Sequence, residues 1–137
     1  MTMKDGAIGE GFTDRLLTEA EARDIVARSL AGLPLDGKRV TVLIPDGTRT
    51  APVPMMFRLV NEALAGRVKA LDYLIALGTH GAMSDGAIAK LVGMTAAEWT
   101  RRWPNVAVHN HLWEKPETFA TLDTISRAEV ETLSRGM

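Results

Sequence analysis

The sequence contains no cysteine and few features that would place it at a membrane or on a nucleic acid. Without cysteine, disulfide bonds and thiolate metal sites are excluded, which fits a reducing compartment, and we expect a cytoplasmic protein. Residues 1–14 lack the apolar segment of a signal peptide, and no apolar run reaches the roughly 20 residues needed to cross a bilayer. The 16 lysines and arginines nearly balance 17 aspartates and glutamates and form no run, so we expect neither a nucleic-acid nor a membrane partner.

Two common nucleotide-binding motifs are also missing. No G-x-G-x-x-G follows a predicted strand, and no G-x-x-x-x-G-K-[ST] occurs, so neither a dinucleotide fingerprint nor a P-loop is supported. What is present is a globular composition, with 46% hydrophobic and 24% charged residues in a chain of 137. Such a chain can bury a core and suits one domain.

Helical and strand patterns alternate along the chain. Three strands are predicted at residues 38–44, 71–77 and 106–109, and capping residues predict helix starts at Thr18, Ser84, Thr95 and Ser126. A further helix after Pro52 and Pro54 lies between the first two strands. This order predicts an α/β fold, a Rossmann-like layered sandwich with a small, mostly parallel sheet and right-handed crossovers. Because the first strand is almost continuously apolar, we expect both of its faces to be covered.

The predicted domain organisation has two parts. Residues 1–17 are expected to be a flexible N-terminal arm, and residues 18–137 are expected to form a partial α/β domain. Three strands make a small sheet, and the last helix has little of its own to pack against. We therefore expect an incomplete fold unit that belongs to a larger protein.

Polar side chains follow the first two strands, at residues 44–49 and 76–81. The carboxyl ends of parallel strands share one edge of the sheet, and ligands bind at that edge in open α/β folds. Arg49 can hold a carboxylate or phosphate, Asp46 can orient the turn or bond a ligand hydroxyl, and Gly47 allows close backbone approach. The alternative is an ordinary Asp-Gly turn with a solvated arginine.

Three histidines are candidates for chemistry. His80 lies just past the second strand between two glycines, where it can transfer protons near neutral pH or be a surface loop residue. His109 and His111 share one face of a strand, but two ligands make a poor metal site, so structural or solvent-facing roles are favoured. Trp99, Trp103 and Trp113 are interpreted as packing residues, since the basic groove of a stacking platform is missing.

Two segments of the sequence resemble a known family. Residues 46–54 read Asp-Gly-Thr-Arg-Thr-Ala-Pro-Val-Pro, which resembles the D-x-T-R…P-x-P segment of the nickel-pincer-dependent lactate racemase family. Residues 76–80 read Ala-Leu-Gly-Thr-His, followed by Met83 and Ser84, and resemble the G-x-H segment of the same family. The spacing of one helix and one strand also agrees. The resemblance covers most of residues 38–137 and corresponds to the first part of the family's N-terminal domain.

The resemblance implies a racemase or epimerase of 2-hydroxy acids that couples proton abstraction to hydride transfer to a cofactor and back. The implied cofactor is a nickel-bearing pyridinium pincer mononucleotide. By the same resemblance, Asp46, Gly47, Thr48 and Arg49 are the implied cofactor-binding residues and His80 is one catalytic proton-transfer residue; no metal ligand is assigned. A non-catalytic anion-binding or assembly module on the same scaffold is the alternative.

The sequence also departs from the family pattern. Gly81 stands where many relatives carry a larger or basic residue, which puts lactate itself as the substrate in doubt. The family's second catalytic histidine, its cofactor-attaching lysine and its nickel-ligand histidine belong to a later Gly-rich region that this chain does not contain. We therefore expect a fragment that is inactive alone. Its expected partners are a 2-hydroxy acid and the remainder of a parent chain, with homo-oligomerisation left open.

Overall fold

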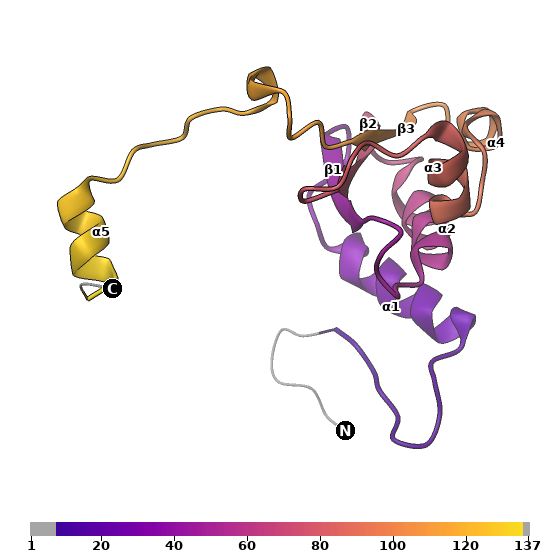
Figure 1. Ribbon diagram of the computed structural model, residues 1–137. Coiled ribbons are helices and arrows are strands. Elements are labelled where there is room, and N and C mark those ends of the chain that lie inside the picture. The colour runs from indigo at the N-terminus through magenta and orange to yellow at the C-terminus, as the bar shows by residue number, and fades with distance from the viewer. Residues whose placement is uncertain (1–7, 136–137) are drawn as a thin grey trace.

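The computed structural model describes residues 8–135, so the first seven residues of the predicted arm and the last two residues of the chain lie outside it. Within that range the chain forms five α-helices, one short 3-10 helix and one three-stranded sheet (Figure 1). In chain order the elements are α1 (Glu19–Ala31), β1 (Arg39–Pro45), α2 (Val53–Leu64), β2 (Ala70–Ala76), α3 (Asp85–Val92), α4 (Ala96–Arg102), β3 (Val106–Asn110), η1 (Pro116–Thr118) and α5 (Arg127–Leu133).

The sheet is parallel throughout, with strand order β1-β2-β3. In its register Leu43 of β1 lies beside Leu74 of β2, which in turn lies beside His109 of β3. All three strands therefore end at the same edge. This arrangement confirms the predicted α/β fold class and brings the two polar corners of the sequence together.

Side-chain caps fix where most of the helices begin. Thr18, Thr95 and Ser126 each form a complete capping box with a glutamate three residues later, and Ser84 caps α3 through the backbone N–H of Ala87. These contacts satisfy N–H groups that have no partner inside the helix. All four predicted helix starts are confirmed.

The hydrophobic core lies on one face of the sheet. Leu71, Tyr73 and Ile75 of β2 are almost completely buried there, and helices α2, α3 and α4 supply the opposing side chains. Figure 1 shows these three helices gathered on one side of the strands. Phe57 of α2 stands at the centre, with its ring centroid 4.7 Å from that of Tyr73 and within about 6 Å of two tryptophans. Those tryptophans are Trp99 and Trp103, so their predicted packing role is confirmed.

The opposite face of the sheet is open among the described residues, which makes the prediction of two-sided burial wrong for β1. Arg39, Thr41 and Leu43 are exposed, and Leu43 retains 70% of its accessible surface. Burial along β1 alternates because the described helices that contribute to the core all pack on one side. The apolar run correctly predicts a strand, but it does not show which other elements pack on each face of that strand.

The part of the described chain that follows β3 lies apart from the sheet and the helices that pack on it. After β3 the chain continues through η1 as an extended segment to α5, which lies far from the sheet (Figure 1). Every residue of α5 is exposed. None of the helices in residues 8–135 is long and apolar enough to cross a membrane.

Candidate functional site

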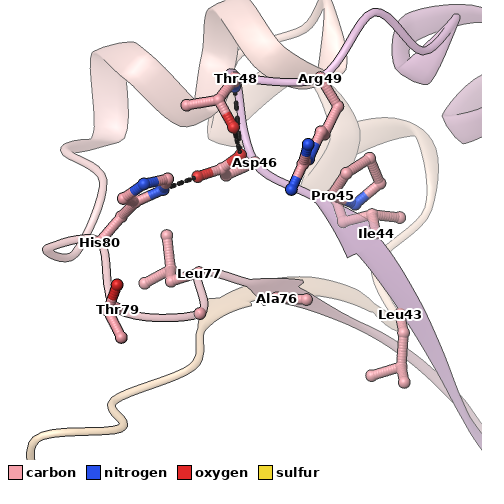
Figure 2. Close-up of a pocket in the computed structure, with 11 residues that line it drawn as sticks. Leu43, Ile44, Pro45, Asp46, Thr48, Arg49, Ala76, Leu77, Thr79 and His80 are labelled. Atoms are coloured by element: carbon pink, nitrogen blue, oxygen red, sulfur yellow. Dashed lines mark hydrogen bonds and ion pairs between the residues drawn. The ribbon is translucent and has the colours of Figure 1, made fainter.

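An open cavity of about 530 Å³ lies at the carboxyl edge of the sheet. It is formed by the ends of β1 and β2 and by the two corners that follow them (Figure 2). Its lining includes Arg49 from the first corner and His80 from the second, so the expectation that these two side chains share one cleft is confirmed. The remaining lining residues are Leu43, Ile44, Pro45, Asp46, Thr48, Ala76, Leu77, Gly78 and Thr79.

The first corner is a tight turn built around the carboxylate of Asp46. One oxygen, Oδ1, accepts hydrogen bonds from the backbone N–H of Thr48 at 3.1 Å and from its hydroxyl at 2.5 Å. Asp46 is 7% exposed, a low value for a carboxylate. Hydrogen bonds from Thr48, followed by the contact with His80, lower the pKa of Asp46 from 3.8 to about 2. The group is therefore ionised at neutral pH.

The second corner is a turn that presents His80 to the cavity. The backbone N–H of His80 donates to the carbonyl of Leu77 at 3.0 Å, and Gly78 adopts φ +60° inside this turn. A positive φ is unfavourable for residues with a Cβ, which accounts for glycine at that position. The turn leaves 57% of the His80 side chain exposed.

The two corners meet through a direct contact between Asp46 and His80. The second carboxylate oxygen of Asp46, Oδ2, lies 2.5 Å from Nδ1 of His80 (Figure 2). This pairs a buried, ionised carboxylate with a half-exposed imidazole across two neighbouring strands. Such a pair can accept or deliver a proton through the other ring nitrogen, Nε2.

Two residues at and beyond the end of β3 bond the second corner and the segment that follows it, and sequence reasoning did not identify them as site residues. Asn110 donates its amide N–H to the carbonyl of Met83 at 2.9 Å and accepts the backbone N–H of Met83 at 3.0 Å. Trp113 donates its indole N–H to the carbonyl of His80 at 3.0 Å. Asn110 ends a parallel strand at the same sheet edge as Asp46. That position in the sequence could have identified it as a candidate site residue.

Arg49 supplies the positive charge of the cavity. Its side chain is directed into the space between the corners (Figure 2), and its guanidinium makes no hydrogen bond or ion pair with another residue of the described chain. A guanidinium left available in a cavity is suited to a carboxylate or a phosphate, which it can hold through two parallel hydrogen bonds.

The other two histidines lie outside this cavity. His109 is exposed on the open sheet face, with Nε2 3.4 Å from Oδ1 of Asp72, and His111 packs its ring against Phe119. In residues 8–135 no three histidine, aspartate or glutamate side chains are grouped so that they could hold a metal ion. The described residues thus fit an anionic group of a ligand beside Arg49.

Comparison with family models decides the relationship. The lactate racemase N-terminal domain model matches residues 13–134. The chain belongs to the lactate racemase N-terminal domain family. Comparison with curated proteins gives no match.

A crystal structure of a protein from Thermotoga maritima has a similar fold, with a TM-score of 0.72 and 26% sequence identity. The similarity covers 88% of this chain but only 27% of the Thermotoga chain. The present chain therefore corresponds to a minor part of that protein.

Proposed function

We propose that this chain carries one part of the active site of a racemase or epimerase that acts on 2-hydroxy acids. The family match supports a relation to lactate racemases. The observation that carries the proposal further is the Asp46–His80 pair, which shares its cavity with the Arg49 guanidinium, a group that has no partner among residues 8–135. A base and an anion-binding group in one cleft suit the hydroxyl and the carboxylate of a 2-hydroxy acid.

Arg49 is proposed to bind the substrate carboxylate or an anionic group of the cofactor. The substrate hydroxyl would then lie next to Nε2 of His80, which takes the hydroxyl proton as the C2 carbon becomes a carbonyl, and returns it in the reverse step. The C2 carbonyl of the keto acid is planar, so hydride returned to one face gives one isomer and hydride returned to the opposite face gives the other. Removal and return of that hydride is the chemistry that a nickel-pincer cofactor supplies when it is bound.

The proposed cofactor-binding residues differ in whether they have polar groups free to contact a ligand. The side chains of Asp46 and Thr48 are hydrogen-bonded to each other, and the carboxylate of Asp46 is hydrogen-bonded to His80 as well. A Cβ at Gly47 would meet nothing closer than Met83 at 3.9 Å, so side-chain crowding does not explain this glycine. Arg49, together with the exposed backbone of Gly47, is the better candidate for direct ligand contact.

A non-catalytic anion-binding module is the second candidate. The observation that favours it is the Arg49 guanidinium in the cavity, which makes no ion pair with another described residue. The two functions differ in what else they need. The family resemblance implies that the enzyme needs a second acid–base group and a lysine that attaches the cofactor, whereas an anion site needs neither. A downstream Gly-rich segment with lysine and histidine in the parent reading frame favours the enzyme, and its absence favours the module.

The test compares His80→Asn and Arg49→Ala in the complete parent protein. His80→Asn is expected to slow racemisation by about 10²–10⁴-fold, the usual contribution of a positioned acid–base group, while ligand still binds. Arg49→Ala is expected to lose occupancy of substrate or cofactor because its role is charge complementarity. The measurements are isomer interconversion with short 2-hydroxy acids, cofactor content and thermal melting.

His109→Asn is the matched control, since His109 is an exposed histidine outside the cavity. It should leave turnover and binding unchanged. Near-parental turnover by His80→Asn would remove His80 from the mechanism. Normal cofactor content and substrate affinity in Arg49→Ala would remove the anion-binding role of Arg49.

A further inference from the structure

We propose that Asp46 is a positioning residue that holds His80 in the tautomer with its proton on Nδ1, so that Nε2 is the free base in the cavity. This inference rests on the proposed function for its catalytic meaning, although its structural content can be tested without any turnover. It gives Asp46 a different role from the direct cofactor contact that the family resemblance implies. The residue would act through His80 instead of on a ligand.

The hydrogen-bonding capacity of the carboxylate carries the argument. An ionised carboxylate can only accept hydrogen bonds, so the 2.5 Å contact between Oδ2 of Asp46 and Nδ1 of His80 requires a proton on Nδ1. Both hydrogen bonds from Thr48 are made to the other oxygen, Oδ1, which leaves Oδ2 to the imidazole. In a neutral imidazole only one nitrogen carries a proton, and Nε2 is then an acceptor.

The surroundings prevent both partners from turning away. Asp46 is buried to 7% exposure and is held by its own turn, so its carboxylate has one orientation. His80 is held at its backbone on two sides, by the carbonyl of Leu77 and by the indole N–H of Trp113. Only the ring of His80 is half-exposed, and its Nε2 makes no hydrogen bond to a described residue.

An asparagine at position 46 reverses the polarity of this contact. The carboxamide of Asp46→Asn can place its N–H₂ against Nδ1, which makes Nδ1 the acceptor and moves the imidazole proton to Nε2. His80 would then present a donor to the substrate hydroxyl and could not take its proton. In the complete parent protein we expect the turnover rate to fall by roughly 10²–10⁴-fold, as for loss of a general base.

The tautomer can be read directly by NMR on the 137-residue chain labelled with ¹⁵N histidine. The chain has three histidines, so the His80→Asn variant assigns the signals of His80. At about pH 8.5, where free imidazole is neutral, the parental chain should show a protonated Nδ1 and an unprotonated Nε2 for His80. Asp46→Asn should shift His80 toward the opposite tautomer.

Two further variants separate positioning from a general structural effect. Asp72→Asn changes the other histidine–aspartate pair, at 3.4 Å, and should alter the signals of His109 while those of His80 stay as in the parent. Thr48→Val removes the hydroxyl donor to Oδ1 but keeps Oδ2 on the imidazole, so it should retain the Nδ1–H tautomer. If these substitutions acted only by unfolding the corner, the ¹⁵N signals of His80 would also change in Thr48→Val.

The outcomes distinguish this inference from the proposed function. An unprotonated Nδ1 on His80 in the parental chain overturns the positioning role, whatever the enzyme does. A tautomer change in Asp46→Asn combined with parental turnover in the complete protein leaves the positioning intact and overturns the use of His80 as the base. A tautomer change accompanied by the expected loss of turnover supports both.

Discussion

At the scale of single residues, the carboxylate of Asp46 both closes the turn after β1 and fixes the imidazole that follows β2. Oδ1 accepts the hydrogen bonds of the turn, and Oδ2 contacts the imidazole. A substitution at position 46 therefore affects both the turn and His80. Asn110 acts in a comparable way at the end of β3, where its side-chain amide hydrogen-bonds both the backbone N–H and the carbonyl of Met83. The geometry of the site therefore depends on side chains whose hydrogen bonds go to other parts of the protein.

The depressed pKa of Asp46 predicts how stability should vary with acid. A carboxylate whose folded-state pKa lies at about 2, below its ordinary 3.8, contributes stability that is fully present above pH 3.8 and is lost as pH falls toward 2. The difference in unfolding free energy between the parental chain and Asp46→Asn should accordingly shrink as pH falls below about 4. Urea unfolding at several pH values measures it. A difference that is unchanged down to pH 2 would contradict the ionised, hydrogen-bonded state of Asp46.

The positive φ of Gly78 predicts a cost in stability when this residue is replaced. Its φ of +60° is unfavourable for any residue with a Cβ, and a Cβ there would meet no atom within 4 Å. Gly78→Ala should therefore destabilise the chain by roughly 1 kcal/mol through backbone conformation alone. Gly81→Ala is the matched control, because Gly81 has the same open surroundings without a positive φ. Equal unfolding free energies for the two variants would show that the turn adapts to alanine.

The pairing of Asp46 with His80 could not have been predicted from sequence spacing. The topology places both residues at one sheet edge, and that much follows from two parallel strands. Which oxygen meets which ring nitrogen depends on the shapes of two separate turns, and neither is fixed by its own residues alone. Sequence reasoning thus predicted that Asp46 and His80 follow neighbouring strands at one sheet edge, and it did not predict their direct contact.

At the scale of helices and strands, the local signals in the sequence were sufficient for most boundaries. Capping residues act on backbone N–H groups three positions away, so Thr18, Thr95 and Ser126 identify helix starts without tertiary information. The coverage of the sheet is different, because it depends on where remote elements pack. The apolar run of β1 predicted two covered faces, and residues 8–135 cover only one.

The difference between the two sheet faces predicts unequal costs for the same substitution. Leu71→Ala removes a fully buried side chain from the core and should cost about 2–5 kcal/mol of unfolding free energy. Leu43→Ala removes a side chain that is 70% exposed on the open face and should change it by no more than about 0.5 kcal/mol. Denaturant unfolding of both variants makes the comparison. A cost at Leu43 similar to that at Leu71 would mean that the open face is covered in solution.

At the scale of the whole molecule, the chain divides into a packed body and a separate C-terminal segment. The body is the three-stranded sheet with the helices on its core face, and it contains the entire cavity. α1 is joined to this body by Leu30, which packs against the core, and by ion pairs such as that of Glu19 with Arg58. No comparable attachment of α5 to the body is found in residues 8–135, and Figure 1 shows α5 at the end of an extended segment.

This division predicts that residues 121–137 can be deleted at little cost. Because α5 is fully exposed, its loss should change the unfolding free energy by no more than about 0.5 kcal/mol and leave the urea m-value nearly unchanged, since m follows the surface exposed on unfolding.

Deletion of residues 1–31 is the contrasting control. It removes α1 with its contacts to α2 and the core, so it should lower both the melting temperature and the m-value. If the C-terminal deletion instead lowers the melting temperature by several degrees, residues 121–135 are packed against the body in solution. The exposed apolar side chains of Leu122, Ile125 and Leu133 would then have a partner on that body, and single alanine variants at these three positions would reproduce the loss.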